Sequence, residues 1–206
     1  LDNLRACGRA VLQAPPGAGK TTRVPLAMLD AELTAGKILM LEPRRLAARA
    51  AAERMAASLD QKVGHTVGYR IRGESAVGPV TRIEVVTEGI LTRMLQDAPD
   101  LPGVGAVIFD EFHERSLNAD LGLALCLEVT DALRDDLILL VMSATLDAGP
   151  VADVMRAPIL TSEGKIVDVE PRWLPKPMAK DMRFEVGMTD LIVSAFAEAH
   201  GSLLAF

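Results

Sequence analysis

The sequence has few cysteines, few aromatic residues and no long apolar run. Its 206 residues include only two cysteines, Cys7 and Cys126, without a CxxC pair, so neither a zinc site of that kind nor a disulfide framework is indicated. Two reduced thiols are typical of a cytoplasmic protein, which is the location we expect. No stretch of ~18 apolar residues occurs, so we expect no membrane span and no membrane partner.

An excess of positive charge is also lacking, since the formal net charge is −6. This excludes a protein that binds nucleic acid through a globally basic surface, but it leaves room for a local basic groove. The aromatic residues are five Phe, one Trp and one Tyr. Any nucleic acid would therefore be held mainly through its backbone, because base stacking needs more aromatic side chains.

Apolar runs of strand length alternate with helical patterns over residues 1–162. Strands are expected at residues 9–14, 37–42, 66–72, 81–87, 105–111 and 137–145. Helices are expected at residues 20–33, 44–59, 88–95 and 116–134. Continuous apolar strands separated by helices predict an α/β domain with a mostly parallel sheet and helices on both faces.

Distinctive polar residues follow several of these strands. They are the glycine loop at residues 14–22, the Pro-Arg-Arg of residues 43–45, Thr87, the acidic pair at residues 110–111, and residues 143–145. Parallel strands end at the same edge of a sheet, and ligands bind there in such folds. We therefore expect these five clusters to meet along one edge.

The segment APPGAGKTT matches the phosphate-binding pattern G-x-x-x-x-G-K-[ST], with Ala14 in the first glycine position. Gly17 and Gly19 permit the tight backbone that points N–H groups at phosphate oxygens. Lys20 can reach the phosphates, and the Thr21 hydroxyl can ligate Mg²⁺. The alternative interpretation is a plain surface turn.

Two adjacent acids, Asp110 and Glu111, end the apolar strand in VIFDEFHERS. An acid placed opposite a phosphate-binding loop can hold Mg²⁺ through water, and a neighbouring Glu can activate the attacking water. The alternative is a solvated charge pair, which would be the preferred interpretation if the glycine loop were absent.

The segments APPGAGKTT, EPRRLAAR, VGYRIR, TEGIL, DEFHER and MSATL occur in this order. Together they resemble motifs I to III of superfamily 2 helicases, and most closely those of the DEAH-box RNA helicases. LQAPPGAGKTTRVPLAML and SEGKIVDVEPRWLP resemble the bacterial HrpB-type group of ATP-dependent helicases. The resemblance extends over residues 9–175.

The resemblance implies a RecA-like P-loop NTPase domain that uses ATP and Mg²⁺. The implied nucleotide-binding residues are Gly17, Ala18, Gly19, Lys20, Thr21, Thr22 and Arg54, which matches an arginine that stacks on adenine. The implied Mg²⁺ ligands are Thr21, Asp110 and Glu111. The implied catalytic residues are Lys20, Asp110, Glu111 and His113, and His113 would link the ATP site to a second domain.

Further residues match positions outside the nucleotide site. Arg45, Arg72 and Thr87 match residues that contact the RNA backbone. Ser143 and Thr145 match residues that couple the nucleotide to domain movement. In the tetrad Asp-Glu-Ala-His of the DEAH pattern, this sequence has Phe112 in place of the usual Ala. The polar residues Asp110, Glu111 and His113 of the tetrad are present.

Residues 163–206 have mixed charge and several prolines, followed by an amphipathic helix at residues 189–200 and the apolar segment GSLLAF. We interpret them as a connector and the truncated start of a second RecA-like domain. The arginine fingers of that domain would be the missing partner within the same protein. Without them we expect weak ATP hydrolysis and no unwinding, because an arginine finger contributes ~10³–10⁵ in rate.

The function expected is therefore that of an ATP-dependent RNA helicase motor domain. Three alternatives remain open: a P-loop ATPase that is not a helicase, a DNA-directed DExH helicase, and a non-catalytic module that retains only the fold. The sequence does not distinguish RNA from DNA, because backbone contacts carry no base information.

Overall fold

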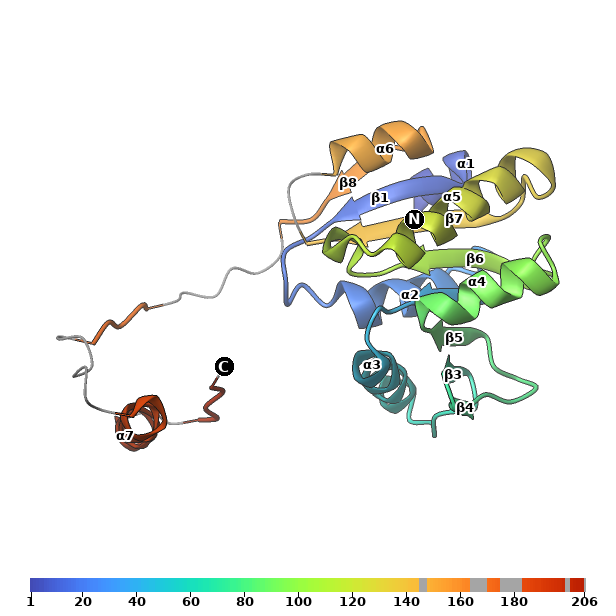
Figure 1. Cartoon of the computed structure of the whole chain (residues 1–206). Coiled ribbons are helices and arrows are strands. Elements are labelled where there is room, and N and C mark those ends of the chain that lie inside the picture. Colours follow the sequence, from blue (N-terminus) through green and yellow to red (C-terminus); the bar gives the residue numbers. More distant parts are fainter. Residues whose placement is uncertain (145–147, 164–169, 175–182, 199–200, 206) are drawn as a thin grey trace. The chain divides into compact units, whose positions relative to one another are not determined.

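The chain divides into two compact units, Leu1–Ile166 and Val167–Phe206, in the computed structural model (Figure 1). The structure describes residues 1–144, 148–163, 170–174, 183–198 and 201–205. Among these residues, no helix is both long and apolar enough to cross a membrane.

The first unit is built on one eight-stranded sheet with the strand order β4-β3-β5-β2-β6-β7-β1-β8. All neighbouring strands run parallel except the pair β3 and β4. The strands are β1 (Arg9–Gln13), β2 (Lys37–Leu41), β3 (Val67–Ile71), β4 (Glu74–Ala76), β5 (Ile83–Val86), β6 (Val104–Phe109), β7 (Ile138–Ser143) and β8 (Ile159–Thr161). The predicted mostly parallel sheet is confirmed.

Helices cover both faces of this sheet (Figure 1). One face packs against α4 (Glu88–Asp97), α5 (Leu117–Ala132) and α6 (Gly149–Met155). The other face packs against α1 (Asp2–Cys7), α2 (Lys20–Asp30) and α3 (Arg45–Ser58). The α/β class with helices on both faces is therefore also confirmed.

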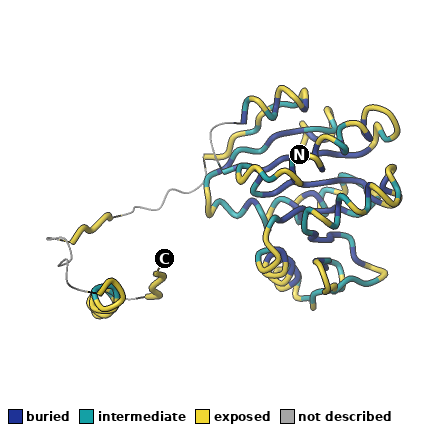
Figure 2. Tube along the Cα trace, viewed as in Figure 1, coloured by how far each residue is buried: buried dark blue, intermediate teal, exposed yellow. Residues whose placement is uncertain are grey.

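The central strands are buried on both sides because their side chains alternate between the two helical layers. In β2, Ile38 and Met40 belong to the core under α2 and α3, whereas Leu39 and Leu41 belong to the core under α4 and α5. Figure 2 shows the resulting band of buried residues along the middle of the sheet. This explains why these strands are continuous apolar runs in the sequence.

Both edge strands, β4 and β8, were absent from the sequence expectation. Each has three residues, and all of these are exposed or half-buried. Such short strands lack the apolar run by which the central strands were recognised. They are held by their hydrogen-bonded neighbours β3 and β1, and Ala76 and Leu160 add partly buried packing against the core.

The second unit contains the helix α7 (Phe184–Glu198), which begins earlier than the predicted start at residue 189. None of its residues is buried. Residues 201–205 form no strand, contrary to the expectation from the apolar segment. A strand needs a hydrogen-bonded neighbour, and none of the described residues pairs with this segment. The assignment of residues 163–206 to a second RecA-like domain stays a prediction.

Candidate nucleotide and nucleic-acid site

The polar clusters expected from the sequence lie at one edge of the sheet, where the parallel strands end. From β3 across to β1, this edge has Arg72 after β3, Thr87 after β5, residues 42–45 after β2, Asp110 and Glu111 after β6, Ser143 at the end of β7, and residues 14–19 after β1. The topology therefore brings together residues that are up to 130 positions apart (13 to 143).

The glycine loop connects β1 to α2 and depends on two left-handed residues. Gly17 has φ +79° and Gly19 has φ +80°, a region that residues with a Cβ rarely adopt. Gly19 is the N-cap of α2, so the loop leads directly into a helix N-terminus that favours anions. Ala14 has no positive φ and is buried, which explains why this position does not require glycine.

The loop is joined to the neighbouring strand by its backbone. The N–H of Ala14 donates a hydrogen bond of 3.0 Å to the carbonyl of Ser143 at the end of β7. Ser143 itself is buried. Two predicted clusters, the glycine loop and the end of β7, are thus in direct contact.

Lys20 and Glu111 form a partly buried ion pair across the site. The distance from Lys20 Nζ to Glu111 Oε1 is 2.8 Å, and the side chains are 6% and 25% exposed. The backbone of Glu111 is left-handed with φ +50°, and its N–H donates to Asp110 Oδ1 at 2.8 Å. The lysine of the loop and the acidic pair after β6 therefore belong to one cluster.

Asp110 has features that suit a cation. Burial raises the pKa of this carboxyl, while hydrogen bonding to the Thr21 hydroxyl and the Glu111 N–H acts in the opposite direction. Its second oxygen, Oδ2, is buried and has no well-directed hydrogen-bond partner among the described residues. A hard cation such as Mg²⁺ would satisfy this oxygen and offset the burial of the charge.

The protein side chains alone would not complete the coordination of such an ion. Among the described residues, no group of three or more His, Cys, Asp or Glu side chains could hold a metal. Mg²⁺ usually keeps several waters and takes further oxygens from substrate phosphates. Thr21 and the acidic pair, placed opposite the glycine loop, fit this mode of binding.

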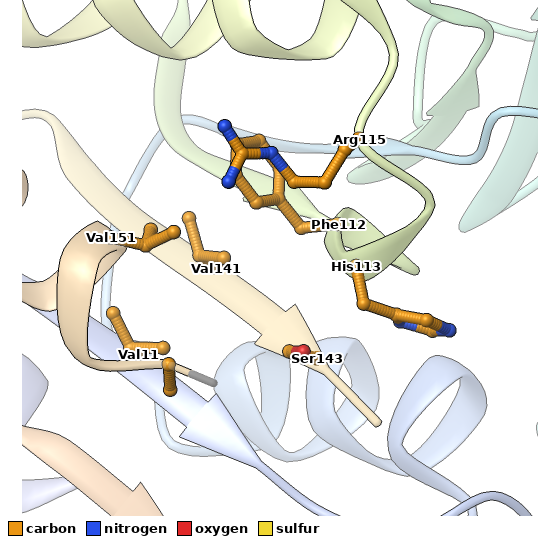
Figure 3. A pocket seen from close by; sticks show the side chains of 8 residues that line it. Val11, Phe112, His113, Arg115, Val141, Ser143 and Val151 are labelled. Atoms are coloured by element: carbon orange, nitrogen blue, oxygen red, sulfur yellow. The ribbon is translucent and has the colours of Figure 1, made fainter. Parts of the chain in front are cut away.

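His113 connects Glu111 to the end of β7. Its Nε2 lies 3.4 Å from Glu111 Oε2, and the N–H of Ala144 donates to its Nδ1 at 3.3 Å. Because Nδ1 accepts, Nε2 carries the proton of the neutral ring and faces the carboxylate. Figure 3 shows His113 beside Ser143 at the tip of β7. Thr145 lies outside the described residues.

Arg54 lies on α3 and lines the same cavity as the phosphate-loop threonines. This cavity has a volume of about 380 Å³. Its lining residues are Thr21, Thr22, Glu42, Arg44, Ala47, Ala50, Ala51, Arg54 and Glu111. The alanines of α3 provide an apolar wall next to the arginine, which is a suitable surface for a planar ring.

The three residues predicted to contact nucleic acid lie at the other end of the edge. Arg45 Nη2 donates to the carbonyl of Arg72 at 3.0 Å, so these two are brought together. Both are exposed. Thr87 is the N-cap of α4 after the adjacent strand β5, and no direct contact joins it to either arginine among the contacts of the described residues.

Glu42 and Glu114 were missed in the sequence. Glu42 is buried directly after β2, and its burial, with Asp110 and Glu111 nearby, raises its pKa to about 8. Glu114 forms an ion pair with Arg44. Glu42 stands at a strand end like the other site residues, and this position was the signal that could have identified it.

Comparisons with known proteins agree with this arrangement. A sequence model of the DEAD/DEAH box helicase family matches residues 3–154. The ATP-dependent RNA helicase HrpB of Escherichia coli is 52% identical over 207 aligned residues, which cover 100% of this chain and 25% of that protein. The ATP-dependent RNA helicase HrpA homologue of Haemophilus influenzae is 34% identical over 200 residues, 95% of this chain and 15% of the relative.

Solved structures give the same result. A crystal structure of the Escherichia coli DEAH/RHA helicase HrpB matches with a TM-score of 0.88 and 51% identity, over 98% of this chain and 26% of that one. A second one, of the Escherichia coli DExH-box NTPase HrpB, has a TM-score of 0.78. The chain thus spans about a quarter of the length of the HrpB matches and 15% of the HrpA homologue.

Proposed function

The chain belongs to the DEAD/DEAH box helicase family, and from this premise we propose that it is the ATP-binding motor domain of an RNA-directed helicase. One observation supports this proposal above all others. Glu111 lies between Lys20 of the phosphate loop and His113, and His113 accepts from the backbone after β7. A phosphate-binding group, a general base and a conformational link are thereby joined by direct contacts.

In the proposed reaction, the loop N–H groups of residues 17–22 and the Lys20 ammonium bind the ATP phosphates. Thr21, Asp110 and Glu111 would hold Mg²⁺, which when bound neutralises charge on the phosphoryl oxygens. Glu111 orients the attacking water and accepts its proton. Arg54 stacks on the base.

At the other end of the edge, Arg45, Arg72 and Thr87 bind the phosphates of a nucleic-acid strand. Guanidinium groups bind phosphate through paired hydrogen bonds and read charge and shape without reading bases. Their proximity to β2, the strand next to the catalytic β6, gives a short path between the two ligands.

We further propose that residues 163–206 lead to a second RecA-like domain, which supplies the arginine fingers. His113, Ser143 and Thr145 couple the nucleotide to the movement of that domain. The isolated chain is then a weak ATPase, and the whole protein works in the cytoplasm, where ATP and RNA are available.

The proposal is tested by titrating the chain with fluorescent ADP and Mg²⁺. We expect saturable binding, and Lys20→Ala should weaken it about 10- to 100-fold because charge-assisted phosphate contacts are lost. Lys62→Ala is the matched control, since Lys62 is exposed and far along the chain in the loop after α3. Equal binding by the wild type and Lys20→Ala would refute the phosphate site.

The nucleic-acid part is tested by repeating the titration with single-stranded RNA or with DNA of the same sequence. A change in nucleotide affinity with RNA supports a helicase motor. An equal change with DNA would favour a DNA-directed enzyme. No change with either would favour a P-loop ATPase that does not act on nucleic acid.

A further inference from the structure

The turn after β6 has an unusual backbone at the point where catalysis is proposed. It is the 3₁₀ turn η1 (Phe112–Glu114), and the residues on either side of it, Glu111 and Arg115, have φ +50° and φ +51°. Residues with a Cβ avoid this region, and such strained residues persist when surrounding contacts hold them. Something outside the turn must therefore fix it.

Phe112 provides such a contact. Its side chain is buried at 4% exposure and belongs to the core under α4 and α5. Its ring meets that of Phe109, the last residue of β6, edge to face with 6.0 Å between centroids. The guanidinium of Arg115 lies over the Phe112 ring, 5.6 Å from its centroid. The Phe112 ring thus contacts both Phe109 at the end of β6 and Arg115 at the end of the turn, and these contacts hold the turn against the sheet.

The neighbours of Phe112 in the sequence point elsewhere. Figure 3 shows the Phe112 ring under Arg115 and beside Val141, while the His113 ring points away from it. Glu111 and His113 are the residues that contact Lys20 and the Ala144 backbone. The buried ring and the two polar side chains therefore project in different directions from one short turn, so a shift of the ring moves the polar contacts.

The space around Phe112 explains why a small residue would not serve here. A cavity of about 100 Å³ already lies beside the ring and is lined by Val11, Val141, Val151 and polar neighbours of the turn. An alanine in place of Phe112 would join the volume of the lost ring to this cavity. Cores collapse only partly onto such voids, and the turn would lose its anchor.

We propose that Phe112 is a positioning residue, whose buried ring holds the left-handed Glu111 and the His113 ring in their contacts with Lys20 and Ala144. This rests on the proposed ATPase function for its kinetic consequence, although the geometric consequence is independent of it. It also means that the tetrad Asp-Glu-Ala-His, which is usual in DEAH helicases, is not interchangeable with the tetrad of this chain.

The test compares Phe112→Ala and Phe112→Leu with the wild type in three measurements. For Phe112→Ala we expect Mg²⁺-ADP affinity within about threefold of the wild type, because the glycine loop is untouched, and single-turnover ATP hydrolysis at least tenfold slower. The ring-nitrogen NMR signals of His113, assigned with His113→Gln, should move from the Nε2-protonated form toward those of free imidazole in the same buffer. Phe112→Leu should restore most of the hydrolysis rate and most of the wild-type His113 signals.

Leu95→Ala is the matched control, because Leu95 on α4 is buried in the same core and lies in a different element from the turn. It should lower stability without altering the His113 signals or the hydrolysis rate by more than twofold. Unchanged His113 signals in both Phe112 variants, or the same loss of rate in Leu95→Ala, would overturn the proposal. If Phe112→Ala fails to fold, Phe112→Leu and Phe112→Met provide the graded series.

A wild type that neither binds nor hydrolyses ATP would refute the proposed function alone. The His113 signals are measured without nucleotide, so they decide the positioning role in either case.

Discussion

The two ends of the sheet edge both carry charged side chains but hold them differently. At the β1, β6 and β7 end, Lys20 and Asp110 are buried, and the polar groups contact one another. At the β3, β5 and β2 end, Arg45 and Arg72 are exposed, and the side-chain contact between them goes to a backbone carbonyl. The first end is preorganised, whereas the second is adjustable.

This difference fits the ligands proposed for the two ends. A phosphoryl transfer needs fixed donors in a dry site, because electrostatic stabilisation is strongest where groups need not reorganise. A nucleic-acid backbone is long and repeats the same charge, so exposed arginines can bind it in several registers.

The largest effect is expected for Glu111→Gln at the preorganised end. The amide cannot accept a proton, so ATP hydrolysis should fall by ~10²–10⁴-fold. Mg²⁺-ADP should still bind, since Lys20 and the glycine loop remain. Single-turnover hydrolysis and a nucleotide titration separate the two effects, with Glu128→Gln on the exposed side of α5 as the control. Unaltered hydrolysis would exclude Glu111 as the base.

The next effect concerns Glu42, which lies at the boundary between the two ends. Its pKa is raised to about 8 mainly by burial and then by Asp110, Glu111 and Glu114. The folded protein keeps this proton, whereas the unfolded chain releases it above its ordinary pKa of about 4.5. The contribution to stability is therefore lost as the pH rises from about 4.5 to about 8.

Glu42→Gln should remove this dependence. Relative to the variant, the wild type should lose about 3–5 kcal/mol of unfolding free energy between pH 4.5 and pH 8. Urea unfolding at several pH values, in EDTA and without nucleotide, measures it. Glu53→Gln on the exposed side of α3 is the control and should follow the wild type. Parallel pH curves for the wild type and Glu42→Gln would contradict the expected shift.

The preorganised end was the easier one to predict from the sequence. The glycine loop is local in sequence, and its left-handed glycines and helix N-terminus follow from the spacing alone. The central strands were recognisable because each is a continuous apolar run. The acidic pair was recognisable because it directly follows one of these runs. What could not be predicted is the contact of Lys20 with Glu111, because it depends on the order of strands in the sheet.

Other parts of the site depend on burial that no local pattern encodes. The raised pKa of Glu42 requires the burial of this side chain after β2 and the approach of three acids that follow β6, Asp110, Glu111 and Glu114. The pairing of Arg45 with Arg72 requires β3 and β2 to lie on either side of β5. The short strands β4 and β8 are too exposed to leave an apolar signal.

A third prediction concerns the buried ion pairs that stabilise the sheet at the adjustable end. Glu84 on β5 is buried at 1% exposure and forms ion pairs with Arg70 at 2.9 Å and Lys37 at 3.6 Å, which lie on the two flanking strands. Replacing both cations, in Lys37→Met with Arg70→Met, leaves a buried carboxylate without a partner. Unfolding free energy should fall by about 3 kcal/mol.

Urea unfolding measures this loss, and Glu84→Gln in the same background is the control. It removes the buried charge, so it should recover much of the lost stability. Nucleotide affinity at the other end should remain unchanged under conditions where the variant is folded. A double variant as stable as the wild type would show that the buried carboxylate needs no cation.

The smallest effect is expected for single arginines at the adjustable end, because each makes one part of an extended contact. Arg45→Ala and Arg72→Ala should each weaken binding of single-stranded RNA about tenfold and reduce the slope of log affinity against log salt by about 0.7. Nucleotide affinity without RNA should not change, since neither residue lines the nucleotide cavity. Fluorescence anisotropy at several salt concentrations measures both values.

Arg5→Ala provides the control, because Arg5 is exposed on α1, before the start of β1 and therefore at the opposite edge of the sheet. It should leave the RNA affinity and the salt slope as they are. Arg45 donates to the Arg72 carbonyl and not to its side chain, so the two substitutions remove separate guanidinium groups. Their effects should therefore add. A double variant no weaker than either single one would mean that only one of these arginines contacts the strand.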